Sequence, residues 1–538
     1  MELENITGFL RRNAAYYPNK PAILHPAKIT FRQLDREVDY YSHGLINLGI
    51  HKGTRTIMLV EAGPDFFVIC FALLRIGAVP VMIDPGMGRR AMVRALRDSG
   101  ATAFIGMTKA HLLRYLYPDS FKNVRIWINT GTTNFPATVS LSSLRQTKDE
   151  FEDDIMLFEG ETAGIFYTSG STGPAKGVIY SAGNMHAQVK LMKNHFKYHP
   201  DDIDLCTFPL LGLFVLCLGC SVVIADMDPV RPASLDAASI INNLNEHRCT
   251  QMFGSPMILR KIVSYSGERQ FELPFLRRII SAGAPVHIEL IKGFLKLCKR
   301  GTLIHTPFGS TEALPVTDIV SAELIERDGE GVGYEAGICV GYPLKDVEIK
   351  IIKITNNEIR FLSDKIECEF GEVGEIIVSG PHITEQYLNK NFSKMGKIND
   401  PEKAIIWHRM GDLGRIDSEG MLWFYGRKNQ MVETKKGPLY TIPTEAVYNK
   451  HPDVCRSALV GVLRKSEIIP VICIQTEAGI KKRDLPRIKT ELAGISASFE
   501  TTRGIDEILF HPDFPVDPRH NAKIFREKLA KWAERRVK

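Results

Sequence analysis

The sequence lacks the features of exported, membrane-spanning and fibrous proteins. Its N-terminus, Met-Glu-Leu-Glu-Asn, has neither the basic nor the apolar segment of a signal peptide. No internal repeat or low-complexity tract occurs. The net charge of +6 over 538 residues is a mild excess, which suits a small anionic substrate and does not indicate a nucleic-acid-binding protein. These absences predict a globular, cytoplasmic protein without a transmembrane segment.

Cysteine is scattered rather than clustered, with 10 residues in the chain. Cys217 and Cys220 form a lone Cys-x-x-C pair, and no second pair completes a cysteine zinc site. A redox pair and two buried small hydrophobic residues both fit this spacing, and the apolar neighbours favour burial. We expect reduced thiols, as is typical of the cytoplasm.

One long apolar run, residues 206–225, has the length of a bilayer span. Pro209, Gly212 and Gly219 interrupt it, and β-branched residues end it. This pattern favours a buried helix, turn and strand over a membrane span.

Alternating strand and helix patterns predict the fold class. The chain is too long for one compact core. Apolar runs at 56–60 and 79–83 read as buried strands and flank a helical window at 66–76, which is a parallel βαβ unit. The pattern recurs and predicts doubly wound α/β sheets. Further strands are expected at 22–24, 103–105, 125–128, 163–167, 221–224, 251–253, 278–281 and 302–306.

The pattern of expected elements changes after about residue 340. Short strands at 347–354, 374–378 and 422–425 with Gly-rich turns predict a small β-barrel or antiparallel subdomain. From about residue 430 a smaller α+β segment follows, with strands at 458–462 and 471–474 and a basic C-terminal helix over 522–538. A solvated charged face is favoured for that helix over an anionic membrane or partner. We expect two domains, 1–428 and 429–538.

Residues 167–178 read Tyr-Thr-Ser-Gly-Ser-Thr-Gly-Pro-Ala-Lys-Gly-Val. Small residues leave backbone N–H groups free to face an anion, and Ser/Thr hydroxyls add donors. The loop is not a Walker A motif, because Lys176 follows Ala and precedes Gly. A plain turn between two strands is the alternative to a polyphosphate-binding loop. The candidate phosphate-binding residues are Thr168, Ser169, Gly170, Ser171, Thr172, Gly173 and Lys176.

A second polar segment, Thr-Pro-Phe-Gly-Ser-Thr-Glu at 306–312, follows a predicted strand. Loops at the carboxyl ends of parallel strands are where α/β sheets bind ligands. Glu312 offers the carboxylate that Mg²⁺ prefers beside phosphate oxygens, and Thr311 offers a donor to a phosphate. A polar loop without chemistry is the alternative.

The string at 167–178 resembles the signature phosphate loop of the acyl-adenylate-forming (AMP-binding) superfamily, which includes acyl-CoA synthetases, peptide adenylation domains and luciferases. Further motifs resemble that family in the family's order along nearly the whole chain. They are Gly283, Ala284 and Pro285 in the turn against adenine, Phe308, Gly309, Ser310, Thr311 and Glu312 in the aromatic-Gly-x-Thr-Glu motif, Asp412, Arg427, and Lys523 in the terminal lysine motif.

The resemblance implies a role for each motif and the cofactors ATP and Mg²⁺. Asp412 would bind the ribose hydroxyls, and Arg427 would contact the ribose. Lys523, on a mobile C-terminal lid, would neutralise charge on the substrate carboxylate and α-phosphate. The family swivels between its domains at a position that is Lys428 or Asn429 in this sequence.

Segments 308–315, 424–462 and 514–529 look like the olefin-biosynthesis branch, the β-lactone synthetases. This resemblance implies a long-chain 2-alkyl-3-hydroxy acid as substrate, whose own hydroxyl attacks the acyl adenylate, and it allows a complex with other enzymes of the pathway. A tethered nucleophile needs no thiol, because its effective concentration is high.

Two other functions remain open. A long-chain fatty acid–CoA or acyl-carrier ligase would use coenzyme A or a carrier thiol, although the histidine that many such enzymes carry in the segment 208–214 is absent. A non-catalytic binding protein is opposed by the intact phosphate loop, Glu312 and Lys523. The apolar segments 208–214 and 252–256 are candidates for an acyl tunnel and equally for ordinary core.

Overall fold

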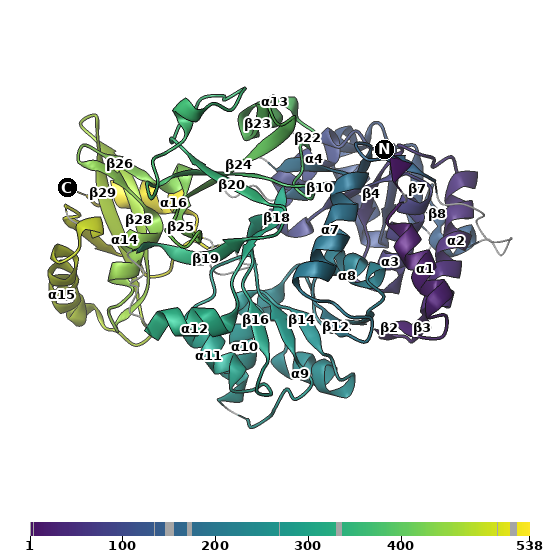
Figure 1. The fold of residues 1–538 in the computed structure, drawn as a ribbon, viewed down its shortest axis with the longest axis horizontal. Coiled ribbons are helices and arrows are strands. Elements are labelled where there is room, and N and C mark those ends of the chain that lie inside the picture. The colour runs from purple at the N-terminus through teal and green to yellow at the C-terminus, as the bar shows by residue number, and fades with distance from the viewer. Residues whose placement is uncertain are drawn as a thin grey trace.

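The computed structural model describes residues 2–3, 5–133, 135–145, 155–168, 175–267, 269–329, 336–502, 504–516 and 524–537. In these ranges the chain forms two mostly parallel sheets, a third antiparallel sheet and a smaller C-terminal sheet. Figure 1 shows the third sheet between the N-terminal layers and the C-terminal part. All ten cysteines are free, as expected.

The first sheet has the strand order β22-β11-β10-β5-β4-β6-β7-β8. Neighbouring strands from β10 to β8 are parallel, while β11 and β22 add an antiparallel edge. The bounds are β4 Arg55–Leu59, β5 Val79–Ile83, β6 Ala103–Gly106, β7 Ile126–Asn129, β8 Val139–Ser140, β10 Thr162–Thr168, β11 Lys176–Ser181 and β22 Gln386–Tyr387. The predicted βαβ unit is confirmed, and β10 and β11, on either side of residues 169–175, pair antiparallel.

The second sheet has the order β16-β15-β14-β12-β13-β2-β3, parallel except at β3. Its strands are β2 Pro21–His25, β3 Ile29–Thr30, β12 Ile203–Cys206, β13 Ser221–Ile224, β14 Gln251–Phe253, β15 Arg278–Ile280 and β16 Leu303–His305. The apolar run is a helix, α8 (Pro209–Cys217), between two of these strands, as predicted. No helix within the described ranges has the length and apolarity that crossing a membrane requires.

Helices cover both faces of each parallel sheet, which confirms the doubly wound architecture. One core lies between the two sheets and contains α1, α2, α3, α7 and α8. Residues of α4 pack on the other face of the first sheet, and residues of α9, α10 and α11 on the other face of the second. The bounds are α1 Thr7–Tyr16, α2 Phe31–Asn47, α3 Pro64–Arg75, α4 Arg89–Asp98, α5 Leu113–Leu116, α6 Leu141–Leu144, α7 Ala182–His195, α9 Ala237–Glu246, α10 Pro256–Ser266, α11 Ile288–Leu295, α12 Ser321–Gly329 and α13 Lys390–Gly396.

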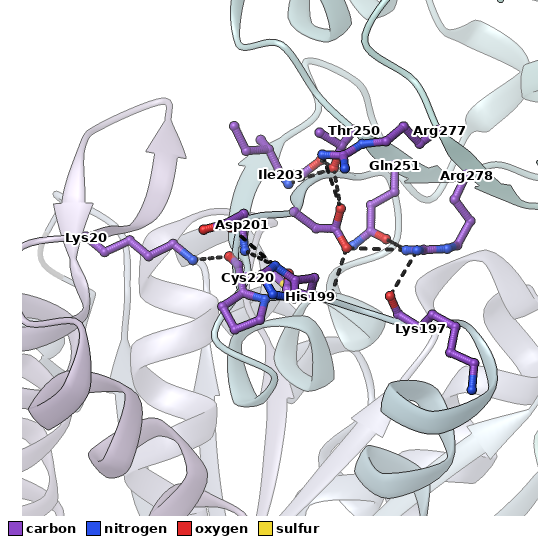
Figure 2. Close-up of polar contacts among 12 residues, drawn as sticks. Lys20, Lys197, His199, Asp201, Ile203, Cys220, Thr250, Gln251, Arg277 and Arg278 are labelled. Carbon is purple, nitrogen blue, oxygen red and sulfur yellow. Dashed lines mark hydrogen bonds and ion pairs between the residues drawn. The ribbon is translucent and has the colours of Figure 1, made fainter. Parts of the chain in front are cut away.

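A polar network fastens the amino ends of the second sheet's strands (Figure 2). The Asp202 carboxylate accepts a hydrogen bond of 2.9 Å from the Thr250 hydroxyl and lies 3.4 Å from an Arg278 Nη1. The same Nη1 donates to Gln251 Oε1 at 2.5 Å. Because these groups bind one another at the amino ends, the opposite, carboxyl ends remain available for a ligand.

The third sheet differs from the expectation in where it begins. Its order is β17-β18-β19-β25-β24-β21-β20, with β23 on β24, and its pairs are antiparallel as predicted. Its first strand starts at Phe308 rather than near residue 340, so part of the predicted loop 306–312 is a strand. The alternating strand pattern is hard to recognise here, because β17 has only three residues and the next strand contains Pro315. The bounds are β17 Phe308–Ser310, β18 Ala313–Asp318, β19 Ile338–Pro343, β20 Glu348–Ile352, β21 Gly374–Ser379, β23 Lys397–Asp400, β24 Ile405–Ile416 and β25 Leu422–Arg427.

The C-terminal sheet is β28 (Val454–Arg464), β29 (Glu467–Thr476) and β30 (Glu507–Phe510), with α14 (Thr441–Tyr448), α15 (Leu485–Ala497) and α16 (Arg526–Glu534). The last helix is shorter than the predicted 522–538, because Ile524 forms a β-bridge with Val516 instead. The remaining strand pairs are β1 Glu2–Leu3 with β9 Leu157–Phe158 and β26 Val432–Thr434 with β27 Gly437–Leu439.

A buried ion triad joins α2 to α3. Arg75 is fully buried, with Nη2 2.5 Å from Asp35 Oδ1 and Nη1 2.6 Å from Asp39 Oδ1. Asp39 is itself buried, and burial raises the pKa of its carboxyl group despite the opposing charge of Arg75. The arginine therefore compensates a carboxylate that has little access to water.

We expect the substitution Arg75→Met to lower the free energy of unfolding by about 3–5 kcal/mol, because it leaves a buried carboxylate without its main partner. The midpoint of the first unfolding transition in urea measures this loss. The control Arg97→Met breaks an exposed pair with Asp98 and should cost less than about 0.5 kcal/mol. Equal losses in the two variants would contradict a structural role for the triad.

Candidate active site

A cavity of about 870 Å³ lies between the carboxyl ends of the second sheet and the third sheet. Most of the described residues that the sequence motifs single out line it together. They are Lys176, Gly283, Ala284, Pro285, Phe308, Gly309, Ser310, Thr311, Glu312, Asp412 and Arg427.

The remaining candidates are Thr168 and six residues outside the part of the chain that the structure describes. Strand β10 ends at Thr168, which pairs with Lys176 across the hairpin. Ser169, Gly170, Ser171, Thr172, Gly173 and Lys523 lie outside the described residues. Ile524 and Arg526 also line the cavity, so the chain that follows Lys523 reaches the site.

The turn Thr311–Glu312 joins β17 to β18 and is held by the edge of the first sheet. The Tyr180 hydroxyl of β11 donates to the Thr311 carbonyl oxygen at 2.5 Å. The Tyr387 hydroxyl of β22 donates to Glu312 Oε1 at 2.6 Å. Thr384 donates its N–H and its hydroxyl to the Glu312 carbonyl oxygen, at 2.9 and 3.1 Å. The orientation of the carboxylate is therefore fixed from a different sheet.

Glu312 stays ionised although only 8% of its surface is exposed. Burial alone would raise the pKa of its carboxyl group, but nearby positive charge and the Tyr387 hydrogen bond outweigh burial and lower that pKa to about 2. Burial also lowers the pKa of His408 to about 3 and that of Lys397 to about 7. At pH 7 His408 is then neutral and Lys397 only partly charged, so the hydrogen bond from Tyr387 and the charged fraction of Lys397 stabilise the carboxylate there. A buried carboxylate of this kind fits Mg²⁺.

Asp412 and Arg427 face each other across β24 and β25. Arg427 Nη1 lies 3.0 Å from Asp412 Oδ1 in an ion pair, yet this oxygen accepts no hydrogen bond from any described residue. Asp412 is only 1% exposed, and burial raises the pKa of its carboxyl group to about 6 against the effect of Arg427. A buried acceptor without a donor, on the wall of a cavity, fits the hydroxyl groups of a ribose.

The turn after β15 contributes backbone rather than side chains. Gly283 has φ +95°, a conformation that non-glycine residues rarely adopt, and a Cβ there would meet no atom within 4 Å. The glycine is thus required by the backbone conformation, not by space. Ser281, at the start of the turn, is buried and its hydroxyl has no partner among the described residues.

Apolar side chains form another part of the cavity wall. Phe208, Leu211 and Phe253 line it, and the rings of Phe208 and Phe253 lie 6.1 Å apart. From the same predicted segments, Leu213 and Met252 are buried in the cores instead. Each segment therefore contributes to both the cavity and the core.

Lys428 is bound to the third sheet. Its Nζ lies 3.0 Å from Glu375 Oε2, and Arg409 Nη2 lies 2.6 Å from the same oxygen. Glu375 and Arg409 are buried. Lys428, one of the two positions at which the sequence suggests a swivel, is therefore held by the third sheet.

Sequence reasoning missed the residues that support the site. Tyr180 and Tyr387 have no motif of their own and meet the Thr311–Glu312 turn only through the contact between the first and third sheets. Lys397 has no motif either and comes from β23 of the third sheet itself. His408 and Arg409 could have been identified from the sequence, because they directly precede the segment containing Asp412.

The raised pKa of Asp412 predicts that the stability of the fold depends on pH. Because the folded-state pKa exceeds that of the unfolded chain, the group stabilises the fold fully only below about pH 4, and this contribution is lost as the pH rises through about 6. We expect Asp412→Asn, relative to the unmodified chain, to gain about 1–2 kcal/mol between pH 5 and pH 8.

The difference in melting temperature between variant and unmodified protein, measured at both pH values without nucleotide, tests this expectation. Asp98→Asn serves as the control for the loss of one exposed carboxylate, because Asp98 pairs with an arginine rather than with a histidine. A pH-independent difference for Asp412→Asn would show that the carboxylate is already satisfied.

Comparisons with known proteins agree with the geometry. The olefin β-lactone synthetase of Stenotrophomonas maltophilia is 38% identical over 510 residues, which cover 94% of this chain and 91% of that protein. The enzyme of the same name from Xanthomonas campestris is 37% identical and covers 98% of this chain and 97% of its own length.

Solved structures with about 20% identity show the same fold. The O-succinylbenzoate coenzyme A synthetase of Bacillus subtilis, in complex with ATP and magnesium ion, matches with a TM-score of 0.76 over 98% of this chain and 100% of its own. The amide bond synthetase of Marinactinospora thermotolerans matches with a TM-score of 0.78 over 98% and 99%.

A family model described as AMP-binding enzyme matches residues 10–388, about two thirds of the chain. With the near full-length relatives and the cavity described above, this match shows that the chain belongs to the AMP-binding family of ATP-using, adenylate-forming enzymes.

Proposed function

We propose that this enzyme activates a long-chain 2-alkyl-3-hydroxy acid with ATP and closes it to a β-lactone. The observation that carries the proposal is the identity of 37–38% along nearly the whole chain to two proteins named olefin β-lactone synthetase. Proteins named as CoA ligases, such as a 2-succinylbenzoate–CoA ligase of Bacillus anthracis, reach only 24%. The cavity supports the proposal, because it combines ionised groups with an apolar wall.

In the first half-reaction the chain's residues position the nucleotide and the acid. Asp412 accepts hydrogen bonds from the ribose hydroxyls, and the turn at Gly283–Ala284–Pro285 lies against the adenine. Lys176 and the loop 168–173 hold the β- and γ-phosphates. Glu312 holds Mg²⁺, which when bound neutralises charge on the phosphate oxygens. The substrate carboxylate then attacks the α-phosphorus, and the bond to pyrophosphate breaks while Lys523 neutralises the developing charge.

The second half-reaction needs no further reactant. The 3-hydroxyl oxygen of the bound acyl adenylate attacks its carbonyl carbon and forms the four-membered ring. The bond between that carbon and the phosphate oxygen breaks, AMP leaves with the negative charge, and the hydroxyl proton passes to solvent. The apolar wall around Phe208, Leu211 and Phe253 holds the alkyl chains and keeps water from the adenylate.

We also propose the domain division 1–428 and 429–538, with the swivel at Asn429. The ion pair of Lys428 with Glu375 supports placing Lys428 in the first domain. Ile524 and Arg526 on the cavity wall support a C-terminal domain that closes over the site and carries Lys523 into it.

The product assay tests the proposal directly. We expect a racemic 2-alkyl-3-hydroxy acid, incubated with ATP, Mg²⁺ and enzyme but no thiol, to give AMP and a β-lactone in equal amounts, detected by nuclear magnetic resonance. The matched control is the same 2-alkyl acid without the 3-hydroxyl group, which should give pyrophosphate exchange but no lactone. A strict requirement for coenzyme A would instead identify a thioester-forming ligase.

The terminal lysine gives an independent test. We expect Lys523→Ala to lower ATP–pyrophosphate exchange by at least about 100-fold, since its contacts form mainly in the transition state, while AMP affinity changes little. The control is Lys528→Ala, which removes an exposed lysine whose ammonium group lies 4.6 Å from the Phe525 ring centroid. Unchanged exchange in Lys523→Ala would assign the role to another residue.

A further inference from the structure

A cluster of metal-ligating side chains lies outside the cavity, where three layers of the fold meet. His195 is the last residue of α7, His305 the last of β16, and Asp318 the last of β18. His195 Nε2 lies 2.8 Å and His305 Nδ1 lies 2.6 Å from Asp318 Oδ2. The three ligand atoms all lie within 4.8 Å of one another. None of these residues lines the nucleotide cavity.

The backbone holds the cluster in place. His305 pairs with Ile280 in the second sheet and forms a bridge with Val320 just beyond β18. Asp318 pairs with Tyr342 in the third sheet. The ring of Phe196 lies edge-on to both imidazoles, with centroids 4.8 and 5.2 Å away, and forms an apolar wall. Three polar groups are thus fixed together, two of them buried and His195 partly exposed.

The hydrogen bonds of the cluster leave one acceptor unused. Both imidazoles converge on Oδ2 of Asp318, while Oδ1 is buried and has no partner among the described residues. The Asp318 side chain is only 2% exposed. One oxygen of this buried side chain is therefore available to a further ligand.

We propose that His195, His305 and Asp318 bind one divalent transition-metal ion, with Zn²⁺ the best match. Two imidazole nitrogens and one carboxylate oxygen are ligands that Zn²⁺ takes in proteins, whereas Mg²⁺ prefers oxygen alone. Ligand atoms around tetrahedral Zn²⁺ lie about 3.3 Å apart, so the two nitrogen–oxygen distances of 2.8 and 2.6 Å must lengthen by about 0.5–0.7 Å. The His195 side chain is 32% exposed, which lets water reach the fourth position.

The ion would brace the fold rather than react with substrate. Its ligands come from the helical layer over the first sheet, the edge of the second sheet and the third sheet. Segment 306–312, which follows His305, leads directly to the turn that carries Glu312. A metal-free hydrogen-bonded triad is the alternative that an experiment must separate.

A titration of the chelator-treated full chain with Co²⁺, as a coloured substitute for Zn²⁺, tests the site. We expect one equivalent to give the intense visible absorption of a low-symmetry, four- or five-coordinate ion, and Zn²⁺ to displace it. His195→Gln and His305→Gln should weaken Co²⁺ binding by at least about 10-fold. One equivalent of Zn²⁺ should raise the melting temperature of the unmodified chain but not of either variant.

The chain provides a matched control in its other candidate cluster, His451, Asp453 and Glu491, which lies in the C-terminal part. His451→Gln should leave the Co²⁺ spectrum unchanged. The absence of the band at one equivalent, or its persistence in both His195→Gln and His305→Gln, would overturn the proposal and leave a hydrogen-bonded triad.

His195 is partly exposed at a helix end, so its variant should fold, which circular dichroism verifies. No readout depends on adenylation, so this proposal and the proposed function can fail separately.

Discussion

The contact between the antiparallel third sheet and the edge of the first sheet is the constraint on which the site depends. A two-residue turn carries Thr311 and Glu312, and by itself such a turn has little to hold it. Two tyrosine hydroxyls and Thr384, all from other elements, bind its carbonyl oxygens and its carboxylate. Because β11 begins at Lys176, the same contact also sets the place of Lys176 relative to the carboxylate.

Two buried carboxyl groups in the cavity wall differ in their charge state. Glu312 and Asp412 are both buried carboxylates, but their surroundings push their pKa values in opposite directions. Glu312 has a donor hydroxyl and nearby positive charge, so it is a carboxylate throughout the physiological range. Asp412 has an ion pair with poor hydrogen-bond geometry and the repulsion of Glu312 and Glu375, so its charged form is less stable. Two groups of the same chemistry are thereby suited to different ligands, a cation and a pair of hydroxyl groups.

The sequence predicted the architecture well where the physical signal is local. Buried parallel strands are short apolar runs, and the stretch 206–225 revealed its helix and strand through Pro209 and its glycines. The prediction was wrong for the start of the third sheet, because a three-residue strand such as β17 has no periodicity to detect. The predicted length of the last helix was also wrong. Ile524 forms a β-bridge with Val516, and a helical pattern in the sequence does not reveal such a bridge. At the site, the described motif residues line one cavity, while Tyr180, Tyr387 and Lys397 were missed, because their role exists only once strands distant in the sequence come together.

The unsatisfied oxygen of Asp412 has a consequence for the life of the protein in a cell. In the proposed function a nucleotide supplies the missing donors to Asp412, and such binding would stabilise the folded state by mass action, whatever happens to the acid. Proteases attack opened molecules, whose population falls as the native state gains free energy. The concentration of free nucleotide in the cell would then influence how long each enzyme molecule survives, as well as how fast it works.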